Sequence, residues 1–238
     1  MGLIYSITPF TMLDYPDKLA CIVWFSGCNM RCIYCYNTEI VKSNGVIENS
    51  EFLRFLDERI NKLEAVVFSG GECTLNKDFL YLAKEVKKRN FSLKIDTNGS
   101  NLENLKKAIN LNLIDYIALD FKALKENYSL VTNSNLYEKF IKTLKYLISL
   151  HFPFEVRTTI HADIFTENDI SKMAKMLEKF GYKGVYYLQN FLETGENFGL
   201  LQNPTNNFDP KKIKSNLKIE LRNFWLLGIF IFFKALFR

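Results

Sequence analysis

"LACIVWFSGCNMRCIYCYN", Leu19 to Asn37, joins an apolar run to a loop that carries three cysteines. Leu19–Phe25 is short and rich in β-branched and aromatic residues, which predicts a buried strand. Cys28, Cys32 and Cys35 follow it with the spacing C-x3-C-x2-C. The sequence therefore places a group of thiols after the carboxyl end of a strand, which is where parallel sheets bind their ligands.

Working outward from this stretch, similar strand-like runs alternate with helix-like runs along the chain. Five more strands are expected, at Ala65–Ser69, Ser92–Thr97, Tyr116–Asp120, Phe154–Ile160 and Gly184–Gln189. Apolar residues three and four apart predict helices between the strands, and their stripes are Phe52, Phe55, Leu56 and Ile60, then Phe79, Leu82, Ala83 and Val86, then Leu136, Phe140, Leu144 and Leu147. Thr166–Asp169 predicts the start of a further helix that runs to Phe180. This alternation predicts an α/β fold of βαβ units around a parallel sheet.

Composition limits the classes of protein to consider. Hydrophobic residues make up 48% of the 238-residue chain and charged residues 24%, which is typical of a globular protein with a core. The net charge of +5 comes from lysines scattered over predicted helices, so no basic stripe indicates nucleic acid. Five cysteines, three of them clustered, make a poor disulfide framework and favour a reducing compartment. The first ten residues lack the pattern of a signal peptide, and we expect a cytoplasmic protein.

Two kinds of metal centre are compatible with the three clustered cysteines. Structural zinc needs a fourth ligand, and the chain offers His151, His161, Cys21 and Cys73. Cys21 lies inside an apolar run and is expected to pack as a small hydrophobic residue, while His161 is expected to be a packing or surface residue. The alternative is an iron–sulfur cluster that three cysteines hold, with one iron left free for a substrate or cofactor. The residues alone leave both interpretations open.

Other polar groups fall where predicted strands end or run. Each could belong to an ordinary turn or charge pair, but together they indicate one site at the carboxyl edge of a parallel sheet. The groups are Gly70, Gly71 and Glu72 in "SGGECT", Asp96, Thr97 and Asn98 in "DTNG", Asp120 and Lys122 in "LDFK", and Arg157 in "EVRTTIH".

C-x3-C-x2-C with an aromatic residue, Tyr34, before the last cysteine resembles the signature of the radical S-adenosylmethionine (SAM) family. This resemblance implies a partial (β/α)6 barrel, a [4Fe–4S] cluster on Cys28, Cys32 and Cys35, and SAM bound to the remaining iron. In that family the reduced cluster cleaves SAM, and the resulting 5′-deoxyadenosyl radical abstracts a hydrogen atom. The protein contributes binding, orientation and exclusion of side reactions.

The resemblance also implies roles for individual side chains. Gly70, Gly71 and Glu72 match the element that meets the methionine amino group of SAM, although Cys73 stands where relatives often carry proline. Asp96, Thr97 and Asp120 match positions that hold a monovalent or divalent cation near the cofactor. The other expected cofactor contacts are Tyr34, Tyr36, Asn98, Lys122 and Arg157. Arg157 could equally pair with an acidic residue, because a buried arginine needs an anion.

Over residues 3–221 the chain is similar to the anaerobic ribonucleoside-triphosphate reductase activating proteins, in their full-length barrel variant. The matching stretches include "TPFTMLDYPDKLACIVWFSGCNMRCIYCYN", "VVFSGGE", "IDTNG", "DYIALDFKA" and "RTTIHAD". The implied reaction forms a glycyl radical on the reductase, with flavodoxin or ferredoxin as the electron donor. Gln189 or Asn190 stands where pyruvate formate-lyase activases carry a histidine. Activation of that lyase, of another glycyl radical enzyme, or chemistry on a small molecule remain alternatives.

The chain ends on an apolar stretch. "FDPKKIKSNLKIELRNF", Phe208 to Phe224, resembles a closing helix and strand, and residues 1–223 are expected to form the radical SAM domain. Residues 224–238 contain the ten-residue run "FWLLGIFIFF", which is too short to span a bilayer because a span needs roughly 20 residues. A last core element, a membrane-surface anchor and a docking segment all fit this tail, and we expect it to add nothing to catalysis.

Overall fold

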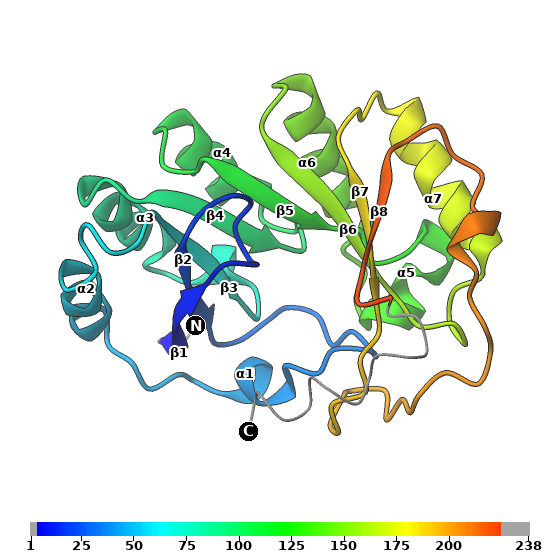
Figure 1. The fold of residues 1–238 in the computed structure, drawn as a ribbon, viewed down its shortest axis with the longest axis horizontal. Helices are drawn as coiled ribbons and strands as arrows, with labels where there is room; N and C mark the ends of the chain where they lie inside the picture. The colour runs from blue at the N-terminus through cyan, green and yellow to red at the C-terminus, as the bar shows by residue number, and fades with distance from the viewer. Residues whose placement is uncertain (1–3, 225–238) are drawn as a thin grey trace.

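The computed structural model describes residues 4–224 and folds them around one curved, eight-stranded sheet (Figure 1). The strands lie side by side in chain order, as β1 (Ile4–Thr11), β2 (Ala20–Phe25), β3 (Ala65–Gly70), β4 (Ser92–Thr97), β5 (Tyr116–Asp120), β6 (Phe154–Ile160), β7 (Tyr186–Asn190) and β8 (Ile219–Arg222). Pairing is parallel from β2 to β8, and β1 runs antiparallel to β2. All six predicted strands are therefore present, although β2 starts one residue and β7 two residues later than expected.

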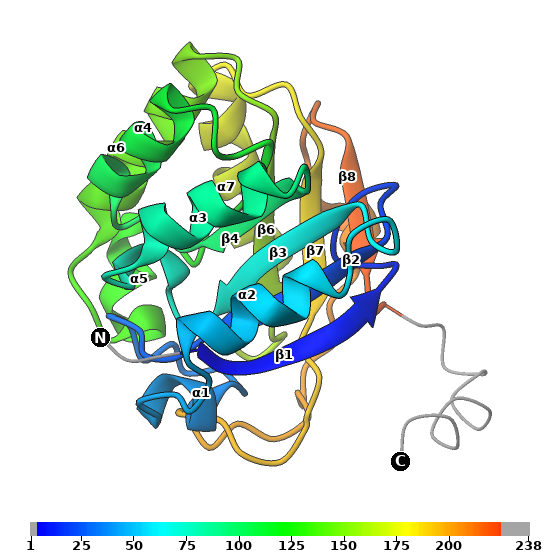
Figure 2. The same ribbon diagram turned by 90° about the vertical axis from the view of Figure 1, so that its left-hand side faces the viewer.

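Helices connect the parallel strands, and α2, α3, α4, α6 and α7 cover the outer, convex face of the sheet (Figures 1 and 2). The helices are α1 (Thr38–Lys42), α2 (Asn49–Asp57), α3 (Phe79–Lys88), α4 (Leu102–Asn110), α5 (Lys125–Thr132), α6 (Tyr137–Ser149) and α7 (Glu167–Lys179). The predicted stripe of α3 is fully buried. The expected start of α7 is confirmed, because Thr166 and Asp169 form a reciprocal capping box.

Helix α2 is shorter than the apolar stripe predicts. It ends at Asp57, and Ile60 lies beyond it with 44% of its surface exposed, so Ile60 was wrongly assigned to the buried face. The amide of Glu58 bonds to the carbonyls of both Arg54 and Leu56, which tightens the last turn, and Asn61 adopts a left-handed conformation at φ 63°. A residue in that region ends the helix.

Two strands at the edges keep the sheet open. β1 and β8 stand at opposite ends of the strand order, so the sheet curves into a partial barrel and does not close on itself. The sequence anticipated β8 within Phe208–Phe224, but the helix expected before it is only a 3-10 turn at Pro210–Lys212. The reason is that this segment runs along α7 and its amides donate to α7 side chains, from Asp209 to Glu167, from Lys214 to Ser171 and from Asn216 to Glu178.

The core lies between the sheet and its helices. Phe25, Phe52, Phe68 and Phe79 are fully buried there, and their rings meet edge to face. Among residues 4–224, no helix has both the length and the apolarity to cross a membrane. The apolar run that begins at Phe224 lies almost entirely outside the described residues, so the domain boundary at residue 223 remains a prediction.

Candidate active site

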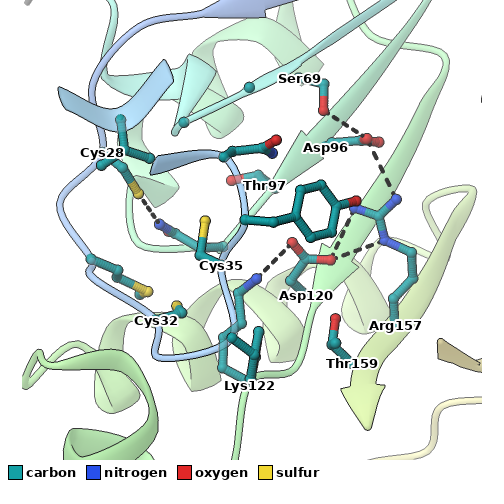
Figure 3. A pocket seen from close by; sticks show the side chains of 18 of the residues that line it. Cys28, Cys32, Cys35, Ser69, Asp96, Thr97, Asp120, Lys122, Arg157 and Thr159 are labelled. Atoms are coloured by element: carbon teal, nitrogen blue, oxygen red, sulfur yellow. Dashed lines mark hydrogen bonds and ion pairs between the residues drawn. The ribbon is translucent and has the colours of Figure 1, made fainter. Parts of the chain in front are cut away.

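The three clustered cysteines lie on the loop between β2 and α1, beyond the carboxyl end of β2. Cys32 is buried and Cys28 and Cys35 are partly buried, and all three line one cavity. Figure 3 shows their sulfur atoms arranged around a common space. Burial raises the pKa of the Cys28 thiol to about 12 and that of Cys32 to about 11. Ligation as thiolates therefore needs the positive charge of a metal to displace the protons.

The loop is fixed by backbone hydrogen bonds from two sides. On one side, the amides of Arg31 and Ile33 donate to the carbonyls of Thr132 and Val131 at the end of α5, each at 2.9 Å. On the other side, the amide of Glu72 donates to the carbonyl of Gly27 at 2.9 Å. These contacts hold the stretch from Cys28 to Cys35 at its start and in its middle.

Gly70 and Gly71 are required by contact between two backbones. Gly70 has φ 108°, and an added Cβ would lie 2.5 Å from the backbone of Phe25. At Gly71 an added Cβ would lie 1.9 Å from the carbonyl oxygen of Gly27. Both glycines also line the cavity. They therefore let the end of β3 pack directly against the start of the cysteine loop while exposing backbone to a bound ligand.

The Glu72 side chain points away from the cavity. It is 1% exposed and is absent from the cavity lining, whereas the other predicted site residues all line it. Its carboxylate accepts hydrogen bonds from the Thr74 and Thr97 hydroxyls, at 2.5 and 2.7 Å, and from the backbone amide of Asn98 at 2.7 Å. Burial raises the pKa of this carboxyl. In this structure Glu72 connects the ends of β3 and β4 and so positions Thr97 and Asn98.

Replacing Glu72 by glutamine should cost about 1–3 kcal/mol of unfolding free energy. The carboxylate accepts hydrogen bonds at both oxygens, whereas the NH2 group of glutamine can only donate. That NH2 group would face buried donors and leave them without an acceptor. Urea unfolding of the metal-free protein measures the loss. Glu64→Gln is the matched control, because Glu64 is exposed and accepts one bond, from the Leu19 amide, which glutamine can still accept. Equal stabilities for the two variants would contradict this assignment.

A chain of alternating charges crosses the wall of the cavity opposite the cysteines (Figure 3). Arg157 on β6 bonds to Asp120 at 2.9 Å and to Asp96 at 3.4 Å. Lys122 bonds to Asp120 at 3.1 Å, and Lys94 bonds to Asp96 at 2.9 Å. Arg157 and Lys122 line the cavity together with the two carboxylates, whereas Lys94 does not line it.

Burial and pairing act in opposite directions on these carboxyls. Burial alone would raise the pKa of Asp96, but the charges of Arg157 and Lys94 outweigh it and lower that pKa to about 2. The pKa of Asp120 is likewise lowered, because Arg157 and Lys122 outweigh the effect of burial. Both groups are therefore ionised at neutral pH. Arg157 thus pairs with acidic residues in this structure, and its contact with the cofactor stays a prediction.

The cation site expected at Asp96, Thr97 and Asp120 stays a prediction. In this structure the carboxylates of Asp96 and Asp120 bind Lys94, Arg157 and Lys122. Within residues 4–224, no three His, Cys, Asp or Glu side chains converge closely enough to hold one metal ion. A cluster of several irons binds each cysteine at a different iron, so it does not need the three sulfurs to converge on one point.

The aromatic and amide residues of the prediction lie around the cysteines. Tyr34 is buried, and its hydroxyl has no hydrogen-bond partner within the described part of the chain. Tyr36 is 53% exposed at the cavity mouth. The side-chain amide of Asn98 approaches the Cys28 sulfur at 3.9 Å and donates to the side-chain oxygen of Asn29 at 2.9 Å.

Sequence analysis missed several residues of the site. Lys94 is 3% exposed and also donates to the Asp14 carbonyl at 2.6 Å, which ties the β1–β2 connection to the barrel interior. Its position two residues before Asp96 puts both side chains on one face of β4, a signal that strand alternation provides. Thr159 lines the cavity by the same alternation, because it lies two residues after Arg157 on β6. Ser69 also lines the cavity and donates to Asp96 at 3.1 Å.

The remaining cysteines and the conspicuous histidine lie outside the cavity. Cys21 and Cys73 are fully buried, and the Cys73 sulfur contacts the Asp96 carbonyl at 3.4 Å. His161 packs against Phe191 and bonds through Nε2 to the Gln202 carbonyl at 2.9 Å. Neither Cys73 nor His161 lines the cavity. Cys21 and His161, the two residues expected to pack, are both buried.

Comparison with known proteins bears directly on this site. The model of the radical SAM superfamily matches residues 22–187. A protein of Methanocaldococcus jannaschii, whose name places it among the glycyl-radical enzyme activating enzymes, is 31% identical over 196 residues, 80% of this chain and 80% of that protein. The pyruvate formate-lyase-activating enzyme of Clostridium pasteurianum is 30% identical over 155 residues, 61% of this chain and 64% of that enzyme.

Solved structures share the fold. Streptococcus suis SuiB bound to S-adenosylmethionine matches with a TM-score of 0.62 at 14% identity, over 84% of this chain and 51% of SuiB. The chain thus spans about half the length of SuiB. At this low identity the match shows a shared fold alone. The superfamily match and the M. jannaschii relative go further, because together they cover most of the chain. This chain belongs to the radical SAM superfamily and, within it, to the glycyl-radical enzyme activating enzymes.

Proposed function

We propose that this protein holds a [4Fe–4S] cluster on Cys28, Cys32 and Cys35, binds SAM beside it, and forms a glycyl radical on anaerobic ribonucleoside-triphosphate reductase. The observation that carries the proposal is the arrangement of the cavity. The three cysteines line one cavity together with two paired cations, Arg157 and Lys122. Such a site suits a metal cluster that needs one further ligand from a cofactor.

The residues present fit both cofactors. Three thiols supply the soft ligands that iron–sulfur clusters take, and the buried Tyr34 hydroxyl has no partner among residues 4–224, so a bound group can satisfy it. Gly70 and Gly71 expose backbone to the cavity, and Arg157 and Lys122 supply positive charge for the SAM carboxylate. When bound, the reduced cluster supplies the electron that cleaves SAM, and the pair supplies a hydrogen-abstracting radical.

The protein's own residues orient the cofactors. Glu72 fixes Thr97 and Asn98, which face the cysteines from the end of β4. Asp96 and Asp120 hold Arg157 and Lys122 in place, and these two carboxylates remain the proposed site for any added cation. Tyr36 lies at the mouth, where it would separate the cofactors from water. The reducing conditions that such a cluster needs support a cytoplasmic location and a flavodoxin or ferredoxin as donor.

Two partners are candidates. Gln189 lines the cavity at the end of β7, where pyruvate formate-lyase activases are expected to carry a histidine, and this favours the reductase. The resemblance to the C. pasteurianum enzyme favours pyruvate formate-lyase as the second candidate. Either partner must present a glycine on a segment of polypeptide that enters the site.

Anaerobic incubation of the cluster-loaded protein with SAM, a strong reductant and the reductase should give a glycyl radical signal by electron paramagnetic resonance. The same mixture with pyruvate formate-lyase should give none. Cys32→Ser is the inactive control, and Cys21→Ala, a change at a buried cysteine outside the cavity, should retain the signal. A signal with the lyase alone would move the assignment to the second partner. The absence of a signal with both would reject these two partners.

A further inference from the structure

Tyr128 carries an unexplained hydroxyl on α5, the helix whose last turn bonds to the cysteine loop. Its side chain on α5 is 1% exposed, and within residues 4–224 its hydroxyl has no hydrogen-bond partner. Its ring packs edge to face against Tyr137 at 5.4 Å, so the ring has a structural role that phenylalanine could equally fill. Buried polar groups in native proteins nearly always have a partner, and one that does not calls for an explanation.

The position of α5 relates this hydroxyl to the cysteine loop. The carbonyls of Val131 and Thr132 accept the amides on either side of Cys32, those of Ile33 and Arg31. Tyr128 lies three and four residues before these two and shares with them the buried face of this helix. The Thr132 hydroxyl bonds back to the Tyr128 carbonyl at 2.6 Å, which fixes this last turn.

The charges that act on the Tyr128 hydroxyl belong to the site. Burial raises the pKa of Tyr128, and Lys122, Cys32, Glu72 and Asp120 are close enough for their charges to change it as well. The phenol therefore stays protonated and keeps a hydrogen to donate. Cys32, the cysteine nearest to α5 in the backbone pairing, is also the most buried of the three.

We propose that the Tyr128 hydroxyl donates a hydrogen bond to a sulfur atom of the iron–sulfur group at Cys32, and so makes that group easier to reduce. The inference rests on the proposed cluster. Reduction adds one negative charge, and a hydrogen bond to a cluster sulfur stabilises the more negative state. Tyr128 is thus a positioning and tuning residue that lies outside the three-cysteine motif.

Tyr128→Phe should lower the midpoint reduction potential of the cluster while the iron and sulfide content stays the same. We expect about a tenfold shift of the reduction equilibrium, which is about 59 mV for one electron. The measurement is a redox titration followed by electron paramagnetic resonance. In D2O, the wild-type reduced cluster should also show a coupled, exchangeable deuteron that the variant lacks. An unchanged potential with a full cluster would overturn the proposal.

The control is Tyr137→Phe, whose ring lies in the same aromatic pair but whose hydroxyl already bonds to the Met176 sulfur at 3.4 Å. Its potential should equal that of the wild type. The metal-free Tyr128→Phe protein should melt no lower than the metal-free wild type, because no protein hydrogen bond is lost. If Tyr128→Phe takes up no iron, 3-fluorotyrosine at position 128 decides instead. Its hydroxyl is a stronger donor, so the potential must rise, and no rise rejects the inference.

This test separates the inference from the proposed function. Iron and sulfide analysis of the wild type tests the cluster directly, and a wild type without iron would reject the proposed function before any variant is compared. A wild type with a full cluster and a Tyr128→Phe potential equal to that of Tyr137→Phe would reject the role of Tyr128 alone.

Discussion

Gly71→Ala should prevent cluster loading and lower the unfolding free energy of the metal-free protein by about 3 kcal/mol or more. The added Cβ would lie 1.9 Å from the carbonyl oxygen of Gly27, and that oxygen belongs to backbone, so no side-chain rotation relieves the overlap. The same carbonyl accepts the amide of Glu72 at 2.9 Å. Moving Gly27 away therefore breaks the bond that holds one end of the cysteine loop.

Two measurements test this expectation together. Urea unfolding gives the stability of the metal-free protein, and iron and sulfide analysis after anaerobic reconstitution gives the loading. Gly181→Ala is the control, because Gly181 has a positive φ of 85° and nothing within 4 Å of an added Cβ. It should cost about 1–2 kcal/mol for the left-handed backbone and leave loading intact. Normal loading of Gly71→Ala would show that the loop does not depend on this contact.

Buried parallel strands were the part of the fold that the sequence predicted best. Their runs of β-branched and aromatic residues are typical of strands buried on both faces of a parallel sheet, and such continuous apolar runs do not fit a surface helix or a loop. β1 was missed because Ile4–Thr11 lacks a regular alternation of polar and apolar residues, contains Pro9, and pairs irregularly with β2 at two register shifts. Proline and a bulge are typical of an edge strand, and neither gives a strong signal in a single sequence.

The residues that line the cavity could be predicted from the sequence more accurately than the contacts they make. The three cysteines, the two glycines and the charged groups at the ends of β4 and β5 line one cavity, since parallel strands bring their carboxyl ends together. Glu72 instead turns inward toward Thr97 and Asn98, and only the loop geometry after β3 decides which way it points. Lys94 was overlooked because a lysine in a strand is usually solvated, and its pairing with Asp96 and Asp14 depends on tertiary structure.

Arg157→Met should lower the unfolding free energy of the metal-free protein by about 3–5 kcal/mol at neutral pH. The change keeps much of the side-chain length but leaves Asp96 and Asp120 without the cation that joins them. Lys94 and Lys122 still bind one carboxylate each, so the loss should stay within this range. Lys125→Met is the control, because its pair with Glu138 is exposed, with 70% and 63% of the two side chains in solvent, and it should cost about 1 kcal/mol or less.

The pH dependence of that loss identifies its cause. In the wild type the pKa of Asp96 is lowered to about 2, so its stabilising contribution is complete above the pKa of the unfolded chain and disappears as pH falls through about 2. Without Arg157, the largest charge that lowers the pKa of both carboxyls is lost, so they take up protons at a higher pH than in the wild type. A neutral carboxyl costs less to bury than an unpaired carboxylate. The stability difference between wild type and variant should therefore be largest near pH 7 and should shrink as the pH falls toward 2, which urea unfolding at a series of pH values measures. A difference that stays constant across this range would mean that lost packing, and not the unpaired charge of Asp96 and Asp120, accounts for the destabilisation.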